Sequence, residues 1–254
     1  MGRNVSLNNY NLDLTNNMVV QKLEHDSMPI HDFTIQELAR RDKAMIVSSQ
    51  YTPKKITIEG QIKGDNIDDL EANIDTFKRS IAGTSITLAI DYASGTRNYT
   101  VALNSFTISR ESFHINYVPF TLELTATDPM GYGTSYTKSW DGVTTSEYDC
   151  TFTANGTIYP EPIITVTINT ETNMGLLKIK NNTTGDEIQL SMDFSASDEI
   201  ILSMITNSIT VNGTAVDFIG KIPEFITGSN SLTATFTADA RNIDMDLTYQ
   251  ARYI

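Results

Sequence analysis

Apolar and polar residues alternate along most of this chain, which is the pattern of half-buried β-strands. One stretch departs from it, with five apolar residues spaced by three and four: Ile67, Leu70, Ile74, Phe77 and Ile81. That spacing places all five on one face of an α-helix. Asp65 or Asn66 can cap its first turn, and Gly83 can end it in a left-handed conformation. The pattern predicts a single amphipathic helix.

Alternating segments flank this helix on both sides. One lies before it, at 56–62, and three follow, at 86–90, 99–108 and 113–124. The last ends at Pro129, which cannot donate to a strand ladder. A helix that covers one face of an antiparallel sheet is an α+β arrangement, which we expect for a first domain over residues 1–136.

The second half of the chain is almost entirely strand-like. Turn signals recur about every ten residues, and they include Asn155-Gly156 and Asn212-Gly213. Many short strands of this kind predict a β-sandwich or jelly roll, placed at 137–242. The polar stretch 136–145 is predicted to be the boundary, with Trp140 packed at that junction. A last alternating strand over 243–254 could join either domain, because period 2 does not identify its sheet.

Residues 33–54 have a different pattern of apolar and charged residues. Phe33-Thr-Ile35 and Met45-Ile-Val47 are apolar, and the segment 37–43 between them is strongly charged. Two apolar arms around a charged centre predict a projecting hairpin or loop. Its apolar ends would be poorly covered in a monomer, which favours oligomers.

Charge and composition narrow the possible partners. The formal net charge is −13, divided as −4 over residues 1–136 (16 acidic, 12 basic) and −9 over 137–254 (15 acidic, 6 basic). An acidic surface repels phosphate, so specific or non-specific nucleic-acid binding is not expected, and the same charge favours solubility. No signal peptide or membrane span is predicted. Cys150 stands alone, which excludes an intrachain disulfide.

The sequence contains no recognisable motif for a catalytic, cofactor or metal site. Histidine occurs only at His25, His31 and His114, and the zinc-protease and nucleotide-binding motifs are absent. Three pairs of carboxylates are candidates for glycosidase catalysis: Asp186 with Glu187, Asp198 with Glu199, and Asp244 with Asp246. Such pairs are expected by chance among 31 acidic residues. We therefore predict that the protein is not an enzyme and uses no cofactor.

The order of these features resembles a known family. The strand 56–62 of the form I-x-I-x-G-x-I, one helix, paired strands and the closing 120–129 resemble the first domain of siphophage distal tail proteins. After Asn155-Gly156, the order of Pro160-Glu-Pro162, Asn212-Gly213 and Gly228-Ser-Asn230 resembles their galectin-like second domain.

The resemblance implies a virion structural protein of the tail tip, made in the cytoplasm of a bacterial host. It implies a homohexameric hub ring that joins the tail tube to the tail-tip apparatus, including a tail-associated lysin or receptor-binding proteins, and leaves a channel for DNA. In the family the segment 33–54 resembles the arm that embraces the next subunit, and a strand like 243–254 can return to the first domain. The candidate interface residues are Phe33, Ile35, Leu38, Met45, Ile46, Val47 and Tyr51.

Carbohydrate recognition through the second domain is the alternative, as in a tail or cell-surface adhesion module. Sugar sites usually combine a flat aromatic ring with His, Asn or Arg. After Trp140 the chain has no His or Trp, and its only Arg residues are Arg241 and Arg252. The missing residue types weigh more than the analogy of fold.

Overall fold

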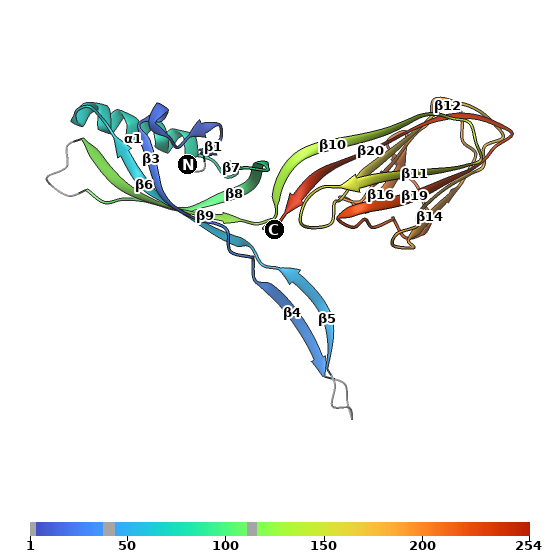
Figure 1. Ribbon diagram of the computed structural model, residues 1–254, viewed down its shortest axis with the longest axis horizontal. Coiled ribbons are helices and arrows are strands. Elements are labelled where there is room, and N and C mark those ends of the chain that lie inside the picture. Colours follow the sequence, from blue (N-terminus) through green and yellow to red (C-terminus); the bar gives the residue numbers. More distant parts are fainter. Residues whose placement is uncertain (1–3, 38–43, 111–115) are drawn as a thin grey trace. The chain divides into compact units, whose positions relative to one another are not determined.

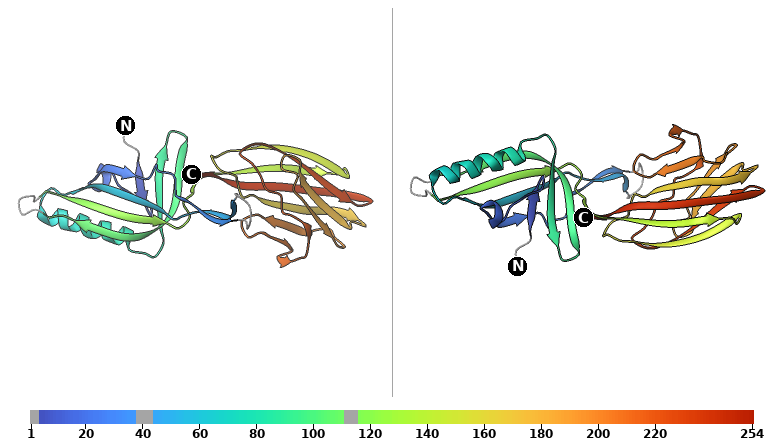
Figure 2. Two further views of the ribbon diagram at one scale, coloured as in Figure 1. Left: turned by 90° about the horizontal axis from the view of Figure 1, so that it is seen from below. Right: turned by 90° about the horizontal axis from the view of Figure 1, so that it is seen from above.

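The computed structural model describes residues 4–37, 44–110 and 116–254 (Figures 1 and 2). The chain divides into two compact units, one up to Tyr132 and one from Gly133 to Tyr253. Both are built mainly from antiparallel strands, and the described residues contain one α-helix. The predicted mainly-β class, with one helix in the first half, is confirmed.

The first unit is one curved antiparallel sheet. Its strands are β1 (Val5–Leu7), β2 (Tyr10–Asn11), β3 (Met18–Glu24), β6 (Lys54–Lys63), β7 (Ile86–Tyr92), β8 (Gly95–Ile108) and β9 (Tyr117–Ala126), with a short 3-10 helix η1 (Leu14–Asn16). They pair in the order β3-β6-β9-β8-β7-β1-β2. The longest ladder joins β6 to β9 over ten residue pairs, so the strand just before the helix lies next to a strand that comes three strands later in the sequence.

Helix α1 (Ile67–Ile81) packs on this sheet, and Figure 2 shows it running alongside the long strands. Asn66 caps it, since its side-chain oxygen accepts from the Asp69 backbone N–H at 2.9 Å. Four of the five predicted apolar positions are buried, but Ile67 is 52% exposed. A helical Cβ points toward the N-terminus, so the side chain of the first residue projects beyond the sheet. Gly83 does not have a positive φ; Ala82 ends the helix in an extended conformation instead.

Phe77 of α1 is at the centre of the core of the first unit. Its ring lies 5.1 Å from that of Phe106 on β8 and 5.6 Å from that of Phe120 on β9. Phe120 also pairs across the ladder with Gly60. A Cβ at Gly60 would come within 2.9 Å of the Phe120 ring and 2.4 Å of the Val19 carbonyl oxygen. Glycine in the I-x-I-x-G-x-I strand therefore makes room for an aromatic ring.

The second unit is a sandwich of two antiparallel sheets. One has the order β17-β16-β15-β12-β20-β10 and the other β11-β19-β13-β14-β18. In Figure 1, β10 and β20 form one layer, and β11 and β19 form another. The strands are β10 (Gly131–Val143), β11 (Glu147–Ala154), β12 (Ile163–Thr172), β13 (Leu176–Asn181), β14 (Glu187–Ser191), β15 (Glu199–Ser203), β16 (Ser208–Val211), β17 (Thr214–Ala215), β18 (Ile219–Gly220), β19 (Gly228–Thr237) and β20 (Ala240–Tyr253).

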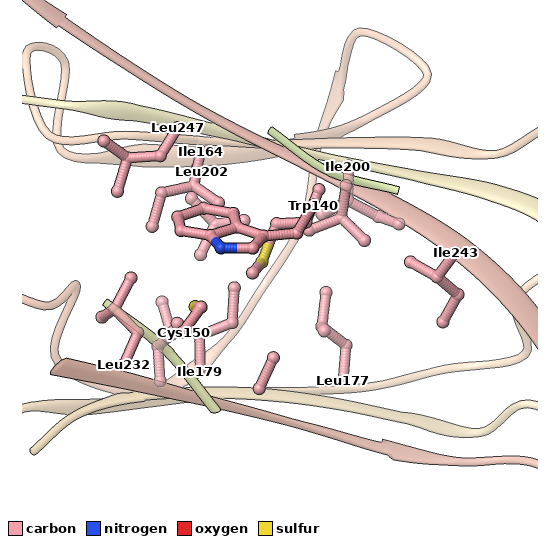
Figure 3. Close-up of a cluster of buried hydrophobic side chains, with 14 of the residues drawn as sticks. Trp140, Cys150, Ile164, Leu177, Ile179, Ile200, Leu202, Leu232, Ile243 and Leu247 are labelled. Atoms are coloured by element: carbon pink, nitrogen blue, oxygen red, sulfur yellow. The ribbon is translucent and has the colours of Figure 1, made fainter. Parts of the chain in front are cut away.

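Trp140 belongs to the core of this sandwich and not to a junction. Its side chain is buried, and Figure 3 shows the indole between side chains of the two sheets, with Ile164 and Leu202 on one side and Cys150 and Leu232 on the other. Trp140 is a packing residue, as predicted, but it does not pack at the predicted boundary between the two domains.

The stretch 136–145, predicted as a polar boundary, lies mostly within strand β10. The chain passes between the two units inside this strand, before residue 136. β10 is the last strand of its sheet in the second unit, and residues 134–139 are all exposed. A strand at the edge of a sandwich can be polar on both faces, which is why its sequence resembles a loop.

The last strand does not return to the first unit. β20 pairs with β12 from Ile163↔Thr248 to Thr172↔Ala240. Ile243, Met245 and Leu247 point into the core of the sandwich. The strand proposed to return over 243–254 is thus an inner strand of the second unit, because its alternation continues the buried face of β12.

Candidate interaction site

Strands β4 (His31–Glu37) and β5 (Ala44–Tyr51) form an antiparallel hairpin, as predicted for this segment. They make a two-stranded sheet of their own, and among the described residues neither pairs with a third strand (Figure 1). An isolated two-stranded hairpin is marginally stable in water. A partner that covers one of its faces would therefore stabilise it.

The register sorts the side chains of the hairpin into two faces. His31 pairs with Tyr51, and Phe33 pairs with Ser49. A bulge between Thr34 and Ile35 then brings Ile35 opposite Ile46 on that same face. The other face carries Asp32, Thr34, Gln36, Met45, Ser48 and Gln50, of which only Met45 is apolar. One face is thus largely apolar and aromatic, and the other is largely polar.

The apolar face begins with an aromatic cluster. The His31 ring stacks on that of Tyr51, with centroids 4.4 Å apart, and lies 4.4 Å from the Phe33 ring. The Ser49 hydroxyl is 2.5 Å from the Nε2 of His31. These contacts orient the rings before any partner binds, which lowers the entropic cost of binding.

The predicted interface residues do not all share this face. Phe33, Ile35 and Ile46 lie on it, Tyr51 is half-buried in its aromatic cluster, and Met45 lies on the polar face. Val47 is the unpaired residue of the bulge. The five large aliphatic and aromatic side chains at 33, 35 and 45–47 are between 45% and 62% exposed. Leu38 lies outside the described residues.

Sequence reasoning missed three residues that belong with this surface. Met28 and Ile30, just before β4, are 68% and 73% exposed. His31 completes the aromatic cluster. Its position two residues before Phe33, on the same face of a strand, is a signal that could have identified it. Exposed apolar side chains that follow one another along the chain, as these do, are typical of protein interaction surfaces.

The base of the hairpin is closed by hydrogen bonds. The Thr52 backbone N–H donates to the Ile30 carbonyl at 2.8 Å, and its hydroxyl donates to the same oxygen. Before the hairpin, His25 is buried, with its Nε2 2.5 Å from the Tyr92 hydroxyl and 3.1 Å from an Asp26 carboxylate oxygen. The chain entering β4 is thereby held to β7.

The chain leaving β5 is held through Lys54. This side chain is buried, and its Nζ lies 5.6 Å from the centre of the Tyr99 ring. Burial lowers the pKa of Lys54, an effect that the nearby Asp26 carboxylate opposes. Burial likewise raises the pKa of Tyr99. Both ends of the hairpin are therefore anchored in the body of the first unit.

The described part of the chain offers little other chemistry. No group of three or more His, Cys, Asp or Glu side chains there could hold a metal ion. No helix among those residues combines the length and apolar character of a membrane span. Cys150 is buried, and burial raises the pKa of its thiol to about 12, so it is not a thiolate nucleophile near neutral pH.

The candidate carboxylate pairs make hydrogen bonds that join separate parts of the second unit. Asp186 accepts from the Glu224 backbone N–H and pairs with Lys221 at 3.2 Å. Asp198 accepts from the Ser195 backbone N–H and from the Asn212 side chain. Asp244 accepts from the Gly142 backbone N–H at 2.7 Å and from Asn169 at 2.8 Å. In each pair, one carboxylate is therefore already engaged in hydrogen bonds that stabilise the fold.

Asp244 leads to a prediction about pH. Its hydrogen bonds from Asn169 and the Gly142 N–H lower its pKa, so the folded state favours the ionised form. That stabilisation is complete above the ordinary carboxyl pKa of about 3.9 and is lost as the pH falls through the lowered value. We expect Asp244→Asn to reduce the stability of the second unit at neutral pH by about 1 kcal/mol, a small cost for a partly solvated group.

Trp140 is the only tryptophan and lies in that unit, so its fluorescence measures this unfolding in the whole chain. The difference between the variant and the wild type should disappear in acid, and Asp246→Asn on the same strand is the matched control. A difference that stays constant from neutral to acid pH would contradict this account.

Comparisons with known proteins agree with the division into two units. A family model described as "Phage tail protein RIFT-related domain" matches residues 6–126. A second, described as "Siphovirus-type tail component, C-terminal domain", matches residues 155–253. Together they span most of the chain. No curated protein matches it.

Among solved structures, the fold is similar to that of the SPP1 Dit protein, described as a paradigm of the hub adsorption apparatus in phages that infect Gram-positive bacteria. The TM-score is 0.69 at 14% identity, and all of both chains is covered. The phage P2 baseplate in its activated conformation with calcium contains a chain with a TM-score of 0.50 at 10% identity, again over all of both chains. At these identities the likeness concerns the fold.

Proposed function

We propose that this chain, which belongs to the siphophage distal tail protein family, assembles into a homohexameric ring in which each β4–β5 hairpin embraces the next subunit. The chain is a structural component of the phage tail tip and is located there in the virion. In the proposed assembly one side of the ring meets the tail tube. The other meets tail-tip proteins, a tail-associated lysin or receptor-binding proteins among them.

The observation that supports this proposal is the exposed apolar face of the hairpin. A ring closed by head-to-tail contacts needs two different complementary surfaces on each subunit. The hairpin is suited to be one of them, because its ends are anchored in the first unit and its apolar face is uncovered. Covering Phe33, Ile35 and Ile46, each about half exposed, would contribute about 1–2 kcal/mol for each side chain.

The acidic charge fits a ring through which DNA passes without binding. A net charge of −13 on each subunit gives the assembly a strongly negative total. Such a surface repels the phosphate backbone at short range. The role we infer is geometric, with no bond-making step and no cofactor.

Native mass spectrometry of the purified full-length chain tests the assembly. The subunit mass is 28.2 kDa, so a hexamer has about six times that mass, roughly 169 kDa. The expected result is a species of this mass that persists on dilution to micromolar concentration. A chain that remains monomeric at high concentration would contradict the proposed ring.

A further inference from the structure

A pocket of about 350 Å³ opens in the second unit, along the edge formed by β10 and β11. Each of these strands is the last of its sheet within the sandwich. The two sheets are therefore not closed off from solvent at this edge. The volume lies at the lower end of the range for small-molecule sites, about 300–1,000 Å³.

The pocket has an aromatic wall. The Tyr136 ring, 37% exposed, stacks on the buried Tyr249 ring with centroids 5.4 Å apart and planes 20° from parallel. Phe152 lies behind Tyr249, with centroids 5.9 Å apart. Because Tyr249 and Phe152 are buried, they support the Tyr136 ring from within the core.

Hydrogen bonds at the Tyr249 hydroxyl make this wall rigid. The hydroxyl donates to the Thr153 carbonyl at 3.0 Å and accepts from the Asn155 backbone N–H at 3.1 Å. Tyr249 on β20 is thus tied to the end of β11, in the opposite sheet. A ring platform that is fixed before binding costs little entropy when a ligand stacks on it.

The remaining lining is polar and lacks carboxylates. Thr151, Thr153 and Ser229 supply hydroxyl groups, Asn155 an amide, and Lys138 an ammonium group. All five residues are exposed. Hydroxyl and amide groups can both donate and accept, so they suit a ligand whose own groups do the same.

We propose that this pocket binds one pyranose ring of a neutral saccharide. The C–H face of a sugar ring carries partial positive charge and packs on the negative face of an aromatic ring, here Tyr136. Its hydroxyl groups match the hydroxyl and amide groups of the rim. Lys138 could attract an anion, but residues 137–254 carry a net charge of −9, which repels polyanions. A neutral ring is therefore the ligand that this surface favours.

This inference gives the protein a direct contact with a glycan, in addition to its role in the tail tip, and does not depend on the ring. Trp and His are absent and Arg is scarce after residue 140, which by sequence alone disfavours sugar binding. The structure assigns the stacking role to a tyrosine, Tyr136, which precedes that point. It adds two hydroxyl-bearing threonines from β11 that no motif indicated.

The test is saturation-transfer NMR and titration calorimetry on the full-length chain. The probes are methyl α-D-glucopyranoside, methyl N-acetyl-β-D-glucosaminide and, as an anion, glycerol phosphate. We expect saturable millimolar binding of at least one glycoside and weaker binding of glycerol phosphate. Tyr136→Ala should weaken glycoside binding about tenfold, the equivalent of about 1.4 kcal/mol. Tyr136→Phe should keep it within about threefold, because the ring face makes the contact.

Tyr159→Ala is the matched control, since Tyr159 is 51% exposed in the same unit and does not line the pocket. Thr153→Val, nearly the same shape without the hydroxyl, is a second variant that should bind a few-fold more weakly. Trp140 fluorescence checks that each variant is folded. The inference is overturned if neither glycoside binds at concentrations on the order of 10 mM. It is also overturned if glycerol phosphate binds more tightly, or if Tyr136→Ala binds as the wild type does.

Discussion

Replacing Ile35 and Ile46 together by aspartate is expected to convert the proposed hexamer into monomers. The two side chains pair across the apolar face of the hairpin, and both are more than half exposed. Each is about 60% exposed, so each would lose about 1–2 kcal/mol of burial in a subunit contact, and each would place a carboxylate against an apolar partner. The combined cost corresponds to a contact at least about 100-fold weaker. Native mass spectrometry measures the shift.

Met45→Asp is the matched control for this experiment. Met45 is 52% exposed on β5, next to Ile46, but the register places it on the polar face. We expect this variant to keep the proposed hexamer. If Met45→Asp dissociates the assembly and the double variant does not, the wrong face of the hairpin has been assigned to the interface. The double change also places two carboxylates directly opposite each other, which weakens the hairpin itself, so the thermal unfolding of each variant is measured as well.

Phe77→Ala should have the largest effect on stability. The substitution removes a fully buried ring that contacts Phe106 and Phe120 and leaves a cavity between α1 and the sheet. Changes of this kind cost about 3–5 kcal/mol. That is a large share of the 5–15 kcal/mol by which domains are usually stable. We expect the first unit to unfold at a much lower denaturant concentration.

Two optical signals separate the units in the intact chain. The helical circular dichroism signal reports α1 and so the first unit, whereas Trp140 fluorescence reports the second. Phe77→Ala should shift the helical transition and leave the tryptophan transition in place. Ile67→Ala, in the same helix at a 52% exposed position, should cost less than about 1 kcal/mol. Equal effects of the two substitutions would show that Phe77 is not at the centre of this core.

The sequence pattern was misleading at two places. One is β10, a strand at the edge of its sheet, and the other is Ile67, the first residue of α1. The polar residues of β10 resemble a loop because an edge strand needs few buried side chains. Ile67 fits the helical period, yet it is exposed because the helix begins there. The helical period at Ile67 was predicted correctly, whereas residues 134–139 of β10 are all exposed and left no period to detect. In both cases a neighbour that would bury the side chains is absent.

Local pattern alone predicted the elements of this protein: the apolar face of α1 with a cap at Asp65 or Asn66, the alternating strands of both halves, and a hairpin or loop with apolar arms. Each of these elements depends on the spacing of apolar and polar residues that are close together in the sequence, so the sequence alone is enough to predict it. Which strands become neighbours is decided by contacts between distant residues. Only the tertiary structure placed β20 against β12, sorted the hairpin into two faces, and brought Tyr136 onto Tyr249 beside β11.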